Sequence, residues 1–153
     1  MAKFQPNRRL PDKPSELILL ALKDLREVER MKKTYAVRMS IFHEVLGQND
    51  YGPTNAGKCG VCFAGSVMAR TLKCNPNEDS IPTDFDRATS KKLYALDSFR
   101  TGNLRKAFEH LEITLPAFVK LPDDYAIEGY SVDPMRFKSD MTKLAKDLAS
   151  MGH

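Results

Sequence analysis

Three cysteines and one histidine are the residues most able to bind a metal ion or to exchange electrons. Cys59 and Cys62 form a C-x-x-C pair, Cys74 follows them, and His43 precedes them. Four nitrogen and sulfur ligands could hold a tetrahedral zinc ion, and a C-x-x-C pair at a helix start could form a redox couple. We expect residues 59–72 to be helical, however, which separates Cys62 from Cys74 by about 18 Å at a rise of ~1.5 Å per residue. Packing as small apolar side chains is the simpler interpretation, and a zinc or thiol site on Cys59 and Cys62 is the alternative.

A glycine-rich segment matches the phosphate-binding pattern G-x-x-x-x-G-K from Gly52 to Lys58. The next position of that pattern is a Ser or Thr that holds Mg²⁺, and here it is Cys59. Because a thiol is a poor ligand for a hard cation, we do not expect nucleotide hydrolysis. Phosphate or nucleotide binding by Gly52, Gly57 and Lys58, at the start of the helix expected next, stays open as a third interpretation.

No complete catalytic set is visible among the other polar residues. His43, His110 and His153 lack metalloprotease spacing, and His43 is best explained as a structural histidine at a strand end. The sequence therefore favours a protein that acts by binding rather than by catalysis.

The basic residues are concentrated at one end of the chain. The net charge is +4, with nine Lys/Arg and five Asp/Glu in residues 1–33, and fifteen of each in the remainder. We expect an extended basic arm over residues 1–14 that meets an acidic protein or a nucleic acid, with the first helix contributing to the same surface. The expected partner-binding residues are Lys3, Arg8, Arg9, Arg26 and Arg30. Elsewhere, a basic groove could form only if folding separated the cations from the anions.

Composition indicates one globular domain over residues 15–153. The chain has 153 residues, of which 42% are hydrophobic and 29% are charged, which argues against disorder, collagen and a disulfide-dense toxin. No segment has the ~20 apolar residues of a membrane span, and residues 1–10 lack the apolar stretch of a signal peptide. An odd number of cysteines in a chain of this size favours reduced thiols and a cytoplasmic location.

The residue pattern predicts a predominantly α fold, with α+β as the second choice. Expected N-caps are Ser15, Asn103 and Asp133, the last followed by a proline suited to the first helical position. Alternation over Tyr35–Ile41 predicts a strand that pairs with residues 117–121 or 125–130. The apolar helix at 59–72 is expected at the centre, and the other helices are expected at residues 15–33, 84–101, 103–111 and 134–151.

Three segments resemble a group of small, uncharacterised bacteriophage-encoded proteins. They are Lys58–Ala69, Leu93–Gly102 and Asp133–Leu148. The resemblance covers most of residues 35–150 and implies a phage-made protein that acts in a bacterial cytoplasm. It supplies no site residues. Together with the missing catalytic set, it leads to the expectation of a non-enzymatic protein that engages a host protein or a nucleic-acid complex.

Overall fold

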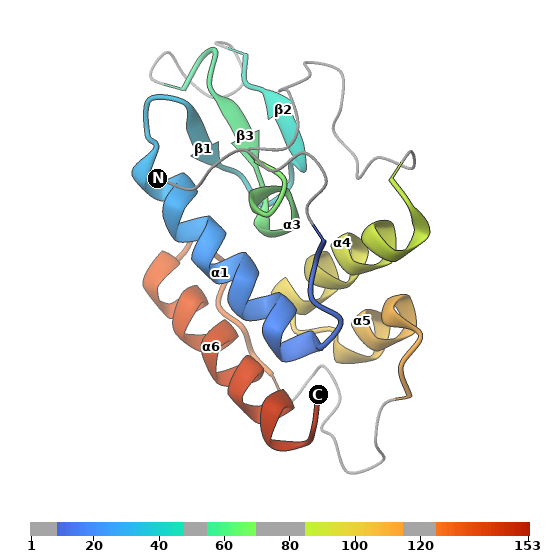
Figure 1. The fold of residues 1–153 in the computed structure, drawn as a ribbon. Helices are drawn as coiled ribbons and strands as arrows, with labels where there is room; N and C mark the ends of the chain where they lie inside the picture. The colour runs from blue at the N-terminus through green and yellow to red at the C-terminus, as the bar shows by residue number, and fades with distance from the viewer. Residues whose placement is uncertain (1–8, 48–54, 70–84, 115–124) are drawn as a thin grey trace.

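The structure, a computed structural model, describes residues 9–47, 55–69, 85–114 and 125–153 (Figure 1). Helices dominate these residues and a small sheet lies at one end, so the prediction of a predominantly α fold with a minor sheet is confirmed. The elements are α1 (Pro14–Arg30), β1 (Tyr35–Val37), β2 (His43–Val45), β3 (Cys59–Val61), α3 (Phe63–Ser66), α4 (Arg87–Arg100), α5 (Leu104–Leu111) and α6 (Pro134–Ser150).

Helices α1 and α6 lie side by side and run in opposite directions (Figure 1). At one end, the N–H and the hydroxyl of Ser15 donate to the carbonyl oxygen of His153, at 3.1 and 3.0 Å. At the other end, Lys138 contacts Glu29. The prediction that Ser15 caps α1 is wrong: the helix begins one residue earlier, because Pro14 suits its first position, and Lys13 is the N-cap.

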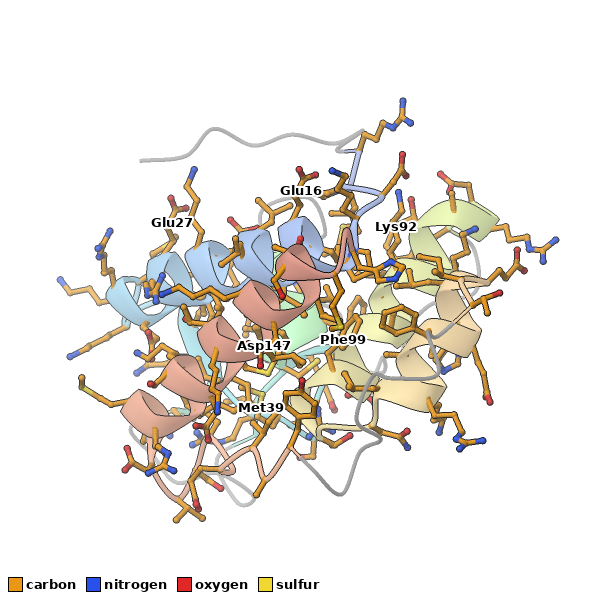
Figure 2. The ribbon with its side chains drawn as sticks, turned by 90° about the horizontal axis from the view of Figure 1, so that it is seen from below. Glu16, Glu27, Met39, Lys92, Phe99 and Asp147 are labelled. Atoms are coloured by element: carbon orange, nitrogen blue, oxygen red, sulfur yellow. The ribbon has the colours of Figure 1, made fainter. Side chains whose placement is uncertain are left out.

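Helices α4 and α5 form a second pair on the other side of the core. Asn103 caps α5 as predicted, since its side chain accepts from the N–H of Lys106 at 3.0 Å. Gly102 separates the two helices with a φ of 78°, a left-handed conformation that suits glycine. Phe99 and Phe108 then meet edge to face with ring centroids 6.2 Å apart, and Figure 2 shows Phe99 in the interior.

The sheet has the order β1-β3-β2, with β3 parallel to β1 and antiparallel to β2. The prediction of a helix over residues 59–72 is therefore wrong at its start, because Cys59–Val61 is the central strand and α3 covers only Phe63–Ser66. Burial was predicted correctly for the described part of this segment, since residues 59–69 are all buried, and residues 70–72 lie outside the described residues. The two edge strands leave unpaired backbone groups that β3 satisfies, and this outweighs the helical preference of a run of small apolar residues.

The strand predicted at Tyr35–Ile41 is present but short, and its partner is β3. Of the two partners expected from the sequence, residues 117–121 lie outside the described residues, and residues 125–130 form no strand.

The described end of the expected basic arm is packed onto α4. Leu10 is buried, and the Lys92 ammonium donates to the Leu10 carbonyl oxygen and to the Asp12 carboxylate, each at 2.8 Å. The ammonium of Lys92 lowers the pKa of Asp12. Residues 9–13 are therefore held on the body (Figure 2) rather than extended away from it.

Candidate binding face

A groove of about 560 Å³ between α1 and α6 gathers positive charge. Four of its lining residues are cations, two carry hydroxyl groups, and none is a carboxylate. The lining residues are Arg26, Met135, Lys138, Ser139, Thr142, Lys143 and Lys146. We refer to this feature as the basic groove.

The helical repeat explains why the lysines of α6 face α1. Lys138, Thr142 and Lys146 are spaced four residues apart and therefore share one side of the helix. The neighbouring side carries the buried residues Met141 and Leu148, which fix the helix against the core. Anchoring the apolar side thus turns the lysines toward the edge shared with α1.

The carboxylates of α6 lie away from the basic groove and have other partners. Asp140 accepts from the guanidinium of Arg136 at 3.1 Å and from the N–H of Glu128 at 3.0 Å. Asp147 accepts from the Tyr125 hydroxyl at 3.5 Å, and it forms no ion pair with Lys143, four residues earlier. Folding therefore separates cations from anions along this helix.

Two of the acidic residues of α1 also lie away from the basic groove. Figure 2 shows Glu16 and Glu27 projecting outward from the helix, and neither lines the basic groove. Together with α6, this arrangement leaves the basic groove lined by cations from both helices and by no carboxylate.

One carboxylate, Glu29, lies at the edge of the basic groove. It accepts from the ammonium of Lys138 at 2.9 and 3.0 Å and from the Tyr130 hydroxyl at 2.6 Å. Burial and the Glu29 carboxylate both raise the pKa of Tyr130, so its hydroxyl stays protonated and donates. Lys138 is thus charge-matched within the protein.

The other three cations of the basic groove have no such match. Arg26, Lys143 and Lys146 are exposed, and none forms an ion pair with a residue that the structure describes. Three cations are therefore available to an anionic partner.

The five predicted partner-binding residues do not gather at one described site. Lys3 and Arg8 lie outside the described residues, and Arg9 is exposed beside Asp12 with the charged atoms 3.5 Å apart. Arg26 lines the basic groove, and Arg30 is exposed at the end of α1.

Sequence reasoning missed Lys138, Lys143 and Lys146. Their spacing was a usable signal, but the contact that brings them to α1 spans 109 positions between Glu29 and Lys138.

The glycine-rich segment does not precede a helix. Gly52 lies outside the described residues, whereas Gly57 has a φ of 80° and donates its N–H to the Leu46 carbonyl oxygen. Lys58 then leads into β3. The expected helix start after Lys58 is wrong, so no helix dipole is available there to hold a phosphate.

Cys59 and His43 are in contact across the sheet. The Cys59 sulfur lies 3.6 Å from Nδ1 and 3.7 Å from Nε2 of the His43 ring. Nearly equal distances place the sulfur between the two nitrogens rather than in line with either. Cys59 is disulfide-bonded in this structure, so the expectation that its thiol is reduced is wrong, and its sulfur is not a thiolate ligand here.

Cys62 lacks the properties of a redox thiol. It is free and buried, and its sulfur accepts from the N–H of Gly65 at 3.4 Å. Burial raises its pKa to about 11, whereas redox-active thiols have lowered pKa values. Cys74, the remaining ligand of the zinc alternative, lies outside the described residues. Within the ranges that the structure describes, no three His, Cys, Asp or Glu residues are grouped so as to hold a metal ion.

No protein family, curated protein or solved structure matches this chain. None of the described helices combines the length and the apolar character needed to cross a membrane.

Proposed function

We propose that the protein is a non-enzymatic binding protein that engages an acidic protein surface through the basic groove. One observation carries the proposal: four cations and two hydroxyls line the basic groove without a carboxylate, and three of the cations have no described ion-pair partner. A surface rich in Asp and Glu would supply the missing charges and accept from the Ser139 hydroxyl, whereas the Thr142 hydroxyl already donates to the Lys138 carbonyl oxygen at 2.7 Å.

Exposed apolar side chains favour a protein over a nucleic acid as the partner. Met135 lines the basic groove and is 78% exposed, and Val132, just before α6, is 75% exposed. Apolar anchors beside charged residues are typical of protein interfaces. None of the seven lining residues is aromatic, so the basic groove offers no platform for base stacking.

A bacterial host partner is part of the proposal because of the resemblance of three segments to phage-encoded proteins. The cytoplasmic location rested on reduced cysteines. A disulfide at Cys59 is more typical of an oxidising compartment, so the proposal names no compartment.

Fluorescence anisotropy with two labelled probes tests the proposal. The first probe is an amphipathic peptide of about 20 residues with Glu on one helical face and Leu on the other, and the second is a DNA duplex of about 20 base pairs. We expect the peptide to bind the protein more tightly than the duplex does. Lys143→Gln combined with Lys146→Gln should weaken peptide binding about tenfold at low salt, since each exposed ion pair contributes up to ~1 kcal/mol.

A matched control separates the basic groove from net charge. Arg105 and Lys106 are exposed on α5 and are not among the residues lining the basic groove, so Arg105→Gln with Lys106→Gln changes the charge equally and should leave peptide binding unchanged. Equal losses in both double variants, or no peptide binding at all, would contradict the proposal. Tighter binding of the duplex than of the peptide would indicate a nucleic acid, rather than an acidic protein, as the partner.

A further inference from the structure

Apolar and charged residues of the basic groove are arranged in order along α6. Met135 lies in the first turn of the helix, and Lys143 and Lys146 lie eight and eleven residues later. At a rise of ~1.5 Å per residue, these separations correspond to about 12 and 17 Å along the helix. A partner must therefore present its apolar and its acidic groups at matching separations.

The apolar end of the basic groove is open to a partner. Four large hydrophobic side chains are exposed among the described residues, and the two most exposed are Val132 and Met135, three positions apart. Covering exposed apolar surface lowers the free energy of a complex, so this end is suited to an apolar side chain of the partner.

Charge at this end is already matched. Lys138, one turn after Met135, is paired with Glu29 at 2.9 Å. Asp133 holds a carboxylate at the start of α6, where it accepts from the N–H of Arg136 at 3.0 Å. An acidic side chain of a partner would meet a paired lysine and a like charge here. Its carboxylates are therefore directed toward the other end, where Lys143 and Lys146 have no described ion-pair partner.

The geometry of the lining favours a helix as the partner element. Met135, Thr142 and Lys146 are separated by seven and four residues, so they share one side of α6 over about three turns. Because α1 and α6 use their backbone groups within each helix, the groove offers no edge with which an extended peptide could pair. A helix satisfies its own backbone and presents side chains at the same three- and four-residue spacing.

We propose that the basic groove binds an amphipathic helix with an apolar residue at one end of its contact face and two carboxylates seven and eleven residues away. The apolar residue contacts Val132 and Met135, and the carboxylates pair with Lys143 and Lys146. Positions i, i+7 and i+11 lie within about 40° of one another around a helix, so one face carries all three groups. The inference rests on the proposed function and adds the secondary structure and the residue order of the partner.

Two peptides of equal composition test the residue order by fluorescence anisotropy. The first has Leu at position i and Glu at i+7 and i+11, and the second has Glu at i and i+11 and Leu at i+7. The same side-chain lactam on the opposite face keeps both helical. We expect the first to bind about fivefold more tightly, because in the second only one Glu can reach a lysine while Leu covers Met135.

The outcomes separate this inference from the proposed function. Equal affinity of the two peptides, with both weakened by Lys143→Gln combined with Lys146→Gln, would overturn the residue order and leave the proposed function in place. Absence of binding by either peptide would overturn both.

Variants assign the ends of the bound helix to the ends of the basic groove. Met135→Ala should weaken binding of the first peptide about fivefold. Leu19→Ala removes another exposed apolar side chain that does not line the groove, and it should leave binding unchanged. Lys146→Glu should weaken binding, and a peptide with Lys at i+11 should restore it better than a peptide with Lys at i. Equal restoration by both peptides would overturn the assignment.

A second copy of this chain is the alternative occupant of the basic groove. Analytical ultracentrifugation of the protein alone should give a monomer at the concentrations at which the peptide binds. A dimer that Lys146→Glu dissociates would place a second copy in the groove and overturn the proposal.

Discussion

At the scale of single residues, His43 shows how burial sets a protonation state. The side chain is 1% exposed, and this burial lowers its pKa, against the opposing effect of its hydrogen bond to the Ala69 carbonyl oxygen. The same oxygen accepts from the Tyr35 hydroxyl. His43 is therefore neutral in the folded protein at pH values where an unfolded chain begins to bind a proton.

This difference predicts a loss of stability in mild acid. Because the pKa of His43 is lower in the folded protein than the value of about 6.5 in an unfolded chain, the unfolded state takes up the proton first. The free energy of unfolding should therefore fall as the pH drops below about 6.5. Urea titrations at pH 7.5 and 5.5 on the wild type and on His43→Gln would measure the free energy of unfolding. Between the two pH values the wild type should lose more of it than the variant. An equal loss in both proteins would contradict the assignment.

Cys62 should be protected from alkylation in the folded protein. It is 3% exposed and its pKa is about 11, so roughly one molecule in a thousand carries a thiolate at pH 8. Iodoacetamide labelling followed by peptide mass spectrometry should modify Cys62 only after denaturant is added. Labelling of native Cys62 at the rate found in denaturant would show that the thiol is accessible.

At the scale of elements, Gly65 controls how α3 packs on the strand region. A Cβ atom at this position would overlap the Phe42 carbonyl oxygen, which is backbone and cannot rotate away. Gly65→Ala should therefore lower the free energy of unfolding by about 3 kcal/mol or more.

The control for Gly65 is another glycine. The Cβ atom added by Gly57→Ala meets no atom within 4 Å. The substitution should still lower the free energy of unfolding by about 1–2 kcal/mol, because alanine is strained at a φ of 80°. Thermal unfolding followed by circular dichroism compares the two. A smaller effect at Gly65 than at Gly57 would contradict the close packing.

Local signals predicted some elements and missed others. Asn103 and Asp133 act through hydrogen bonds within a few residues, so the sequence alone identified them. Cys59–Val61 becomes a strand because β1 and β2 pair with it from both sides, and that pairing involves residues distant in sequence. A short apolar segment without periodic polar residues carries no signal that distinguishes a buried strand from a buried helix.

At the scale of the whole molecule, charge is organised by face rather than by position in the chain. Outside residues 1–33 the sequence has fifteen cations and fifteen anions, which gives no indication of a basic surface. The basic groove combines Arg26 with three lysines of α6. The sequence indicated Arg26 but not the lysines that join it, because their approach to α1 depends on packing between elements far apart in sequence.

Removal of α6 should unfold the protein. The helix buries Phe137, Met141 and Leu144 in the core that includes the apolar side of α1. A chain ending at residue 133 should lose cooperative thermal unfolding, measured by circular dichroism, whereas removal of residues 151–153 should lower the melting temperature by only a few degrees. Cooperative unfolding of the shorter chain would show that α1 is stable without its partner helix.

The pairing of α1 with α6 also sets the order of events during synthesis. Glu29 and Lys138 are 109 positions apart, and at about 5–20 residues per second the ribosome needs roughly 5–22 s to add the intervening chain. Throughout that time the part of the apolar stripe of α1 that packs on α6 is uncovered, although α3 and α4, which also contact α1, are made earlier. The nascent chain therefore still presents apolar surface to chaperones. The basic groove does not yet exist on it. A chain still attached to the ribosome therefore cannot use this groove, and engagement of a partner there begins only after translation of α6.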